Sequence, residues 1–366
     1  MRRILAPFSG FLERLPRSVI YGILRLLFGI RTKPRPLSVK NLRRILLFRY
    51  DRIGDMVLTT PIFDLIKANA PEIEIHVLAS PSNAAILRCD ERISTIYRFR
   101  ISWRELWRLR QEMRQVQFDA VACLVFNKTW DGLLAAWLCG TKTPRITVAH
   151  EHRIKFYEPL YDIQVPRPPS SSSLAELHTH VVAGAFGWKR DGAALSLRIC
   201  PDASKRQQNY LRHIAKNRQT LLINCSAGSS ERSLSAQQVS DLAQLLQQHY
   251  PELCLMVVGM PSDSAMIASI CVLAPSIMPI PPTDDIHEVC ALVQSVTWLI
   301  TPDTSLVHIA SAVGTPLVAL YANNSRNDML FVPCGVRHER IVAEENQAVC
   351  DISSQIILEN FTRLVA

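Results

Sequence analysis

Two short segments of the chain combine residue types that can do chemistry on a phosphorylated substrate. The first is residues 49–55 (RYDRIGD), which end an apolar run and place an acid, Asp55, directly after Gly54. A glycine lets the backbone turn or approach a ligand closely, and a carboxylate can accept a proton from a hydroxyl group. Asp55 also stands at the start of a predicted helix, where a carboxylate caps unpaired amides. The residues alone leave both roles open and favour the cap.

The second segment is residues 301–308 (TPDTSLVH), which follow another apolar run. Asp303 is the expected N-cap of a helix, and Thr304 and Ser305 then present backbone amides and hydroxyl groups at its start. Unpaired amides and the positive end of the helix dipole together suit a diphosphate. His308 follows Thr304 by about one helical turn and can reach the same anion. A histidine in such a helix, taken alone, is more often a core residue.

A third segment, residues 226–232 (SAGSSER), holds small residues, the hydroxyl groups of Ser229 and Ser230, and Arg232. It can form either a phosphate cradle or an ordinary loop between a strand and a helix. Neither GxGxxG nor GxxxxGK[ST] occurs in the chain. These absences disfavour dinucleotide-dependent oxidoreductases and P-loop kinases.

Short apolar strands alternate with helices on both sides of an irregular middle, and this pattern indicates parallel sheets covered on both faces. The predicted strands are 44–49, 73–79, 96–99, 120–126, 220–226, 253–258, 277–280, 297–301 and 317–321. The predicted helices are 56–70, a short one from 82, 102–117, 132–138, 236–250, 263–272, 285–295, 304–313 and 353–365. Residues 147–199 are predicted to be irregular, with 175–186 as an optional helix.

The fold class is therefore α/β, with two doubly wound units and a ligand site at the carboxyl ends of their strands. We expect a basic N-terminal extension over 1–40, a first domain with its linker over 41–200, a second domain over 201–350 and a terminal helix over 351–366. The terminal helix can pack on either domain.

Composition supports a folded globular chain. Its 366 residues are 48% hydrophobic and 20% charged, which argues against disorder. The ten cysteines include no CxxC pair, and most lie in apolar runs. We expect buried, reduced thiols, for example at Cys89 and Cys123, and a reducing compartment.

The N-terminal segment carries much of the formal net charge of +9, since Glu13 is the single acid of residues 1–49. Its apolar run 18–30 is too short to span a bilayer and is interrupted by Arg25. A basic amphipathic helix there can lie on an anionic membrane face or pack on its own domain, and both remain open. Nucleic acid is a poorer partner, because no binding module accompanies the basic run.

Residues 44–67 and 301–321, in this order, resemble the two signature regions of glycosyltransferase family 9, the ADP-heptose:lipopolysaccharide heptosyltransferases. The similarity extends more weakly over residues 41–350. It implies a GT-B fold, in which two Rossmann-like domains face an interdomain cleft. It also implies inverting sugar transfer from a nucleotide diphosphate, with no metal and no other cofactor.

The resemblance also assigns roles to residues. Asp55 matches the catalytic aspartate, which would take the proton of the acceptor hydroxyl. The donor-binding positions are Asp303, Thr304, Ser305, Leu306, His308, Arg232, Ser229 and Ser230. Basic residues of the first domain, with Gly54, are the expected acceptor side: Arg100, Arg104, Arg145, His150 and Arg153. The sequence departs from the family pattern at Leu234-Ser235, at 322–324 (ANN) and after Gly259, where Asp263 stands near a usual glutamate.

The expected activity is transfer of heptose from ADP-heptose to a lipopolysaccharide core (lipid A-Kdo) acceptor. An anionic glycolipid acceptor would place the enzyme in the cytoplasm, peripheral at the inner membrane, with residues 1–40 as a possible contact. Three alternatives stay open: another nucleotide sugar on a different glycan or protein, a non-catalytic glycan-binding relative, and a nucleotide-sugar epimerase. The missing glycine fingerprint disfavours the last.

Overall fold

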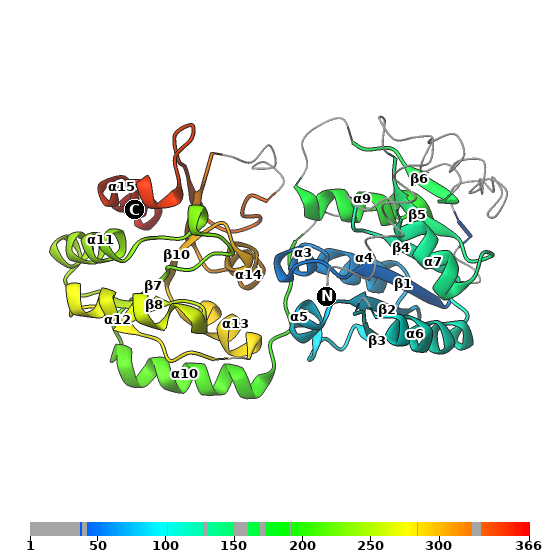
Figure 1. The fold of residues 1–366 in the computed structure, drawn as a ribbon, viewed down its shortest axis with the longest axis horizontal. Coiled ribbons are helices and arrows are strands. Elements are labelled where there is room, and N and C mark those ends of the chain that lie inside the picture. Colours follow the sequence, from blue (N-terminus) through cyan, green and yellow to red (C-terminus); the bar gives the residue numbers. More distant parts are fainter. Residues whose placement is uncertain are drawn as a thin grey trace.

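The computed structural model consists of two α/β units that lie side by side (Figure 1). It describes residues 37–38, 42–100, 102–126, 130–149, 160–168, 173–190, 192, 194–283, 285–323 and 331–366. Most of the expected N-terminal extension therefore lies outside the described residues, as do His150 and Arg153. Within the described part of the chain, every helix is too short or too polar to span a bilayer.

The first unit is built on a six-stranded parallel sheet in the order β3-β2-β1-β4-β5-β6. Its strands are β1 (Arg44–Arg49), β2 (Glu74–Ala79), β3 (Ile93–Arg98), β4 (Ala120–Cys123), β5 (Arg145–Val148) and β6 (Ile163–Val165). Ile45 on the central β1 pairs with Ile75 on one side and with Ala120 on the other. Both faces of β1 are covered, which explains its unbroken apolar sequence. Leu46 and Phe48 pack on one face, and Ile45 and Leu47 on the other.

The helices of the first unit are α3 (Ile53–Val57), α4 (Thr60–Asn69), α5 (Pro81–Ala84), α6 (Trp103–Val116), α7 (Asp131–Cys139) and α9 (Leu174–Phe186). The single helix predicted over 56–70 is wrong, because the structure has two helices there. Thr59 is the N-cap of α4 and Pro61 lies in its first turn. Proline lacks an N–H group, so it fits the start of a helix better than its interior.

The second unit repeats the strand order of the first, as β9-β8-β7-β10-β11-β12. Its strands are β7 (Thr220–Asn224), β8 (Cys254–Val258), β9 (Met278–Pro279), β10 (Trp298–Pro302), β11 (Leu317–Tyr321) and β12 (His338–Val342). Its helices are α10 (Pro201–Ala215), α11 (Ala236–His249), α12 (Ser264–Leu273), α13 (Ile286–Ser295), α14 (Ser305–Val313) and α15 (Ser354–Val365). The terminal helix α15 packs on α11 and β12, and so on the second unit. The predicted α/β class with two doubly wound sheets is confirmed; the domain boundaries stay a prediction.

The sequence patterns did not predict four elements: β5, β6, β12 and α10. The expectation of irregular structure over 147–199 is wrong for β6 and for α9, which the sequence offered only as an option. β6 has three residues, too few to show a period. α10 buries only Ala203, Leu211 and Ala215, so its sequence carries little of the apolar periodicity that marks a core-facing helix.

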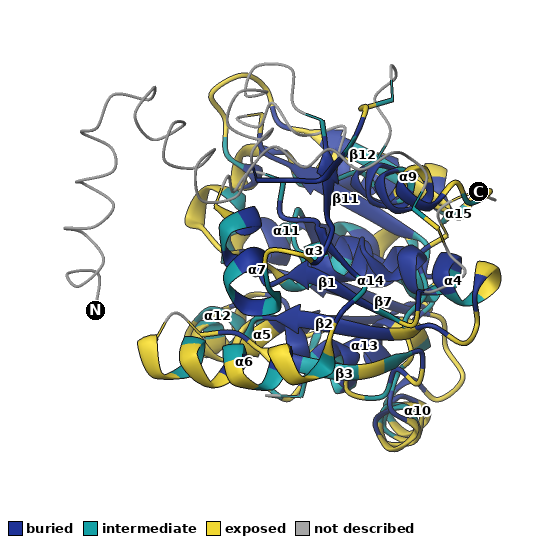
Figure 2. Ribbon diagram, turned by 90° about the vertical axis from the view of Figure 1, so that its right-hand side faces the viewer, coloured by how far each residue is buried: buried dark blue, intermediate teal, exposed yellow. Residues whose placement is uncertain are grey.

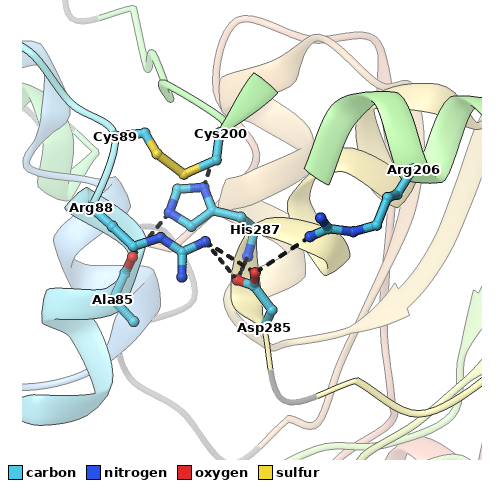
Figure 3. The surroundings of a disulfide bond; sticks show 7 residues. All are labelled: Ala85, Arg88, Cys89, Cys200, Arg206, Asp285 and His287. Carbon is cyan, nitrogen blue, oxygen red and sulfur yellow. Dashed lines mark hydrogen bonds and ion pairs between the residues drawn. A yellow bond between two sulfur atoms is a disulfide. The ribbon is translucent and has the colours of Figure 1, made fainter. Parts of the chain in front are cut away.

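A disulfide joins Cys89 to Cys200, which corrects the expectation of a reduced thiol at Cys89 (Figure 3). Their Cα atoms lie 5.4 Å apart although 111 residues separate them in the chain. Cys89 belongs to the first unit and Cys200 is the N-cap of α10 in the second. A bridge between such distant cysteines leaves no spacing signal in a sequence. The thiols of Cys123 and Cys139 are free, as expected, and burial raises the pKa of Cys139 to about 12.

Polar contacts beside the disulfide also join the two units (Figure 3). The amide of Cys200 donates to Nδ1 of His287 at 3.3 Å, and Nε2 of His287 lies 3.0 Å from the carbonyl oxygen of Ala85. Both contacts are satisfied when the proton of the neutral ring is on Nε2. Arg88 pairs with Asp285 across the units at 3.0 Å.

Candidate active site between the two units

Asp55 lies on α3, directly after β1, and its carboxylate is held by an arginine. Nη2 of Arg49 lies 3.0 Å from Oδ1 of Asp55, and Nε of Arg49 donates to the Asp55 carbonyl oxygen at 3.0 Å. The N-cap of α3 is Arg52, and no side chain caps this end of the helix. The structure therefore does not support the cap role of Asp55. Its side chain is 14% exposed, and Oδ2 has no hydrogen-bond partner among the described residues.

Arg49 is the residue of this site that the sequence did not reveal. Its side chain is buried at the end of β1, and Nη1 donates to the carbonyl oxygen of Leu124 at 2.6 Å. Nε also lies 3.3 Å from Oδ1 of Asp51. A buried guanidinium with several acceptors is rigid, so it fixes the position of Asp55. The only sequence signal is an arginine that closes an otherwise apolar strand.

Gly54 brings α3 against α14 of the second unit. A Cβ atom at residue 54 would lie 2.9 Å from Cδ2 of His308 and 3.4 Å from Cα of Ser305. Real Cβ atoms essentially never approach another atom to 2.9 Å, so any side chain at residue 54 would force the buried ring of His308 to move. The structure thus brings together the two segments that the sequence singled out.

The start of α14 differs from the expectation in one respect: its N-cap is Thr304, not Asp303. Oγ1 of Thr304 accepts from the amide of Leu306 at 3.3 Å. The amide of Asp303 instead donates to the carbonyl oxygen of Leu320 on β11, at 2.8 Å. The amide of Asp303 therefore continues the hydrogen bonding of the sheet, and the helix begins after it, at Ser305. Oγ1 of Thr304 also lies 3.2 Å from Oγ1 of Thr301.

Arg232, Ser229 and Asp303 form one cluster beside the start of α14. Nη1 of Arg232 lies 3.4 Å from Oδ2 of Asp303, and Nε donates to Oγ of Ser229 at 3.3 Å. Ser230 is exposed next to them. The side chain of Leu306 packs against the core, and its backbone amide donates to Thr304.

His308 is buried, with 4% of its surface exposed. Burial lowers the pKa of His308 to about 4, so the ring is neutral near pH 7. Nδ1 has no hydrogen-bond partner within the described residues. The ring is therefore a buried, neutral group that packs against Gly54 beside the start of α14.

Asn224 is a second residue that the sequence did not reveal. It ends β7, and its Nδ2 donates to Thr301 Oγ1 at 3.0 Å and to the carbonyl oxygen of Ser226 at 3.1 Å. β7 and β10 are the neighbours at which the strand order of this sheet reverses. Ligands of doubly wound sheets bind at such a point.

A cavity of about 200 Å³ lies at the carboxyl ends of β8 and β9. It is lined by residues of both loops and of α10 and α13, among them Gly259, Ile280, Tyr210 and Leu292. Asp263, next to this loop, accepts a hydrogen bond from the hydroxyl group of Ser226.

The acceptor candidates do not gather at one place. Arg145 is 2% exposed on β5, and its Nε lies 2.9 Å from Oδ2 of the buried Asp162. This ion pair removes Arg145 from the acceptor candidates, because a buried and paired guanidinium does not reach a substrate. Arg100 is exposed just before α6, and Arg104 is exposed in the first turn of α6.

The described residues contain one group that could hold a metal ion, formed by Cys89, Cys200 and His287. The two sulfur atoms of this group are joined in the disulfide.

Two doubly wound units that meet through helices following their strands define the GT-B class of glycosyltransferase. A model of the family described as glycosyltransferase family 9 (heptosyltransferase) matches residues 106–360. The chain therefore belongs to glycosyltransferase family 9 and is a glycosyltransferase.

Individual relatives are distant. The chain is 21% identical over 293 residues to the lipopolysaccharide core heptosyltransferase OpsX of Haemophilus influenzae, covering 78% of this chain and 81% of that protein. A family 9 glycosyltransferase of Veillonella parvula is similar in structure, with a TM-score of 0.75, 15% identity, and coverage of 90% and 98%. E. coli heptosyltransferase WaaC, solved with ADP, gives a TM-score of 0.70 at 13% identity, covering 88% and 98%. These structural likenesses show the shared fold.

Proposed function

We propose that this glycosyltransferase transfers heptose from ADP-heptose to a lipopolysaccharide core acceptor of the lipid A-Kdo type, with inversion at the anomeric carbon. The matching relative is a lipopolysaccharide core heptosyltransferase, and WaaC has been solved with ADP and with ADP-2-deoxy-2-fluoro heptose. The observation that carries the proposal is the contact of Gly54 with α14, which sets Asp55 beside the start of that helix.

Asp55 is the proposed general base. Arg49 holds Oδ1, so Oδ2 can accept the proton of the acceptor hydroxyl group. As the proton leaves, the hydroxyl oxygen bonds to the anomeric carbon of the donor and the bond to the diphosphate oxygen breaks on the opposite face. The electron pair of that bond leaves with the diphosphate. General base catalysis of this kind is typically worth about 10²–10⁴-fold in rate.

The start of α14 is the proposed diphosphate site. The amides that follow Thr304 and the dipole of the helix stabilise negative charge, which grows on the leaving group during transfer. Arg232 lies beside this helix start and can pair with the same charge. His308 lies in the first turn of the same helix and contacts Gly54. These groups would supply the charge stabilisation without a metal.

The cavity at β8 and β9 is the proposed nucleoside site. β10, β7 and β8 are neighbours in the sheet. Adjacent strands lie about 4.8 Å apart, so the ends of β10 and β8 are separated by about 10 Å. A nucleoside diphosphate can extend over that distance, with its phosphates at α14.

Asp263 favours a second candidate, the same reaction with another nucleotide sugar. Its carboxylate is bound to Ser226, and it stands near the position of a usual family glutamate. A different acid with a different partner changes what the nucleoside side can recognise.

A donor screen tests the proposal. Purified protein is incubated with a truncated lipid A-Kdo glycolipid and ADP-, GDP- or UDP-sugars, and the product is detected by mass spectrometry. We expect ADP-heptose to add one heptose, with an anomeric configuration opposite to that of the donor by NMR. Transfer from another nucleotide sugar alone would favour the second candidate. No transfer from any donor would contradict the proposal.

A further inference from the structure

Three indole rings cluster on the surface of the first unit. Trp103 and Trp107 of α6 are 72% and 48% exposed, and Trp137 of α7 lies beside them. The ring centroids are 6.4 Å apart for Trp103 and Trp107, and 6.2 Å apart for each pair with Trp137. We call these three residues the tryptophan patch. An exposed aromatic cluster is unfavourable in water and marks an interaction surface.

The core does not need this face of α6. The helix buries Leu109 and Met113 against the sheet. Trp103 and Trp107 are one turn apart and lie together on the outer side. The same is true of Arg110 and Arg114 further along the helix.

Arginines surround the tryptophan patch without acidic partners. Arg108 forms ion pairs with both acids of α6, at 2.9 Å to Glu105 and 2.6 Å to Glu112. No acid pairs with Arg104, Arg110 or Arg114 among the described residues. The guanidinium of Arg110 lies 4.9 Å from the ring centroid of Trp137, so cation and indole form one surface.

The tryptophan patch lies away from the second unit. Figure 1 places α6 and α7 at the end of the first unit that is far from α14, and Figure 2 shows much of α6 exposed. A large flat partner can therefore contact this end without covering the proposed active site.

We propose that the tryptophan patch, with Arg104, Arg110 and Arg114, binds the headgroup region of an anionic phospholipid bilayer. Indole rings favour this region because one edge is apolar and the N–H is polar. Arginine pairs with lipid phosphates, and its side chain reaches along apolar surface. Arg110 and Arg114 donate to the carbonyl oxygen of Trp137, so their positive charge is held at the patch with no neutralising acid in the described part of the chain. This excess of cations selects an anionic partner over a neutral one. The inference rests on the proposed function in one respect, because a glycolipid acceptor requires the enzyme to work at a membrane.

Quenching by brominated lipid tests where the protein touches the bilayer. All six tryptophans of the chain are at 103, 107, 130, 137, 188 and 298, so residues 1–40 contribute no signal. We expect vesicles of phosphatidylglycerol with brominated phosphatidylcholine to quench the wild-type emission relative to the same vesicles without bromine. In the variant W103F/W107F/W137F, phenylalanine keeps the surface apolar, and the three remaining tryptophans should show little quenching.

The affinity is tested with R110Q/R114Q and a matched control, R212Q/K216Q, which removes two exposed charges from the second unit. Each arginine near a membrane contributes about 1 kcal/mol, so each loss should weaken vesicle binding about fivefold. High salt should weaken wild-type binding as well. The control should bind like the wild type.

Three results would overturn the proposal: unquenched wild-type protein on the vesicles, equal quenching in the phenylalanine variant, or equal affinity of R110Q/R114Q and wild type. Circular dichroism of each variant checks the fold, and the arginine variants keep the test valid if the phenylalanine variant does not fold. The measurement uses no donor and no turnover. Its failure is therefore distinguishable from a failure of the proposed transfer reaction.

Discussion

At the scale of residues, local pattern and long-range contact contribute differently. Asp55 and Gly54 could be found in the sequence, because an acid after a glycine at a strand end is a local pattern. The ion pair of Asp55 with Arg49 could not be found in the sequence, because it depends on the burial of Arg49 beside Leu124, which follows β4. The choice of Thr304 over Asp303 as N-cap depends in the same way on a bond to the neighbouring strand.

The buried His308 predicts a pH dependence of stability. Its pKa falls from 6.5 to about 4 in the folded protein, because burial disfavours the charged ring. Between these values the unfolded chain binds a proton that the folded chain does not, so stability is lost as pH falls. We expect His308 alone to cost about 2 kcal/mol of the free energy of unfolding between pH 7 and pH 4.5.

Urea unfolding of the wild type and of His308→Gln at the two pH values measures this contribution. Buried His178 and His287 are present in both proteins, so the difference between the two pH slopes belongs to His308. A variant as sensitive to acid as the wild type would show that His308 is not buried as described.

At the scale of elements, strong periodicity decided which parts were predictable. β11 was predicted with the bounds 317–321 that the structure shows, because its five residues are all buried and apolar. α10 is mostly solvated and β6 is short, so neither gave a pattern. The break between α3 and α4 depends on Pro61, whose preference for a first turn is readable but competes with a continuous apolar stripe.

At the scale of the whole molecule, two sheets could be predicted from the alternation of strands and helices. That alternation does not predict their identical strand order or the residues through which they meet; the family resemblance implied only that two domains face each other. Gly54 shows the reason, since its need for a hydrogen side chain comes from His308, 254 positions later in the sequence. The link from Cys89 to Cys200 is equally non-local.

The disulfide predicts a redox-dependent stability of the assembled units. It closes a loop with a sequence separation of 111 residues. In the chain-entropy model such a link contributes about 4–5 kcal/mol. We expect a reductant to lower the urea midpoint of the wild type and to leave Cys89→Ser unchanged.

Cys350→Ser is the matched control, because Cys350 is exposed and free. Its urea midpoint should respond to reductant as the wild type does. In the wild type without reductant, iodoacetamide should alkylate Cys350, whereas Cys89 and Cys200 should stay unmodified, as measured by mass spectrometry. Alkylation of both Cys89 and Cys200 in the unreduced, unfolded protein would contradict the disulfide.

The central claim is that Asp55 removes the proton of the acceptor hydroxyl beside a donor held at α14. The most direct test is the transfer rate of Asp55→Asn, measured together with its donor affinity by calorimetry, with Glu72→Gln as the control. Glu72 is exposed in the turn before β2, whereas Arg49 pairs with Asp51 and Asp55. We predict a loss of about 10²–10⁴-fold in transfer for Asp55→Asn with donor affinity unchanged, and near wild-type transfer for the control. Transfer by Asp55→Asn at the wild-type rate would contradict the account.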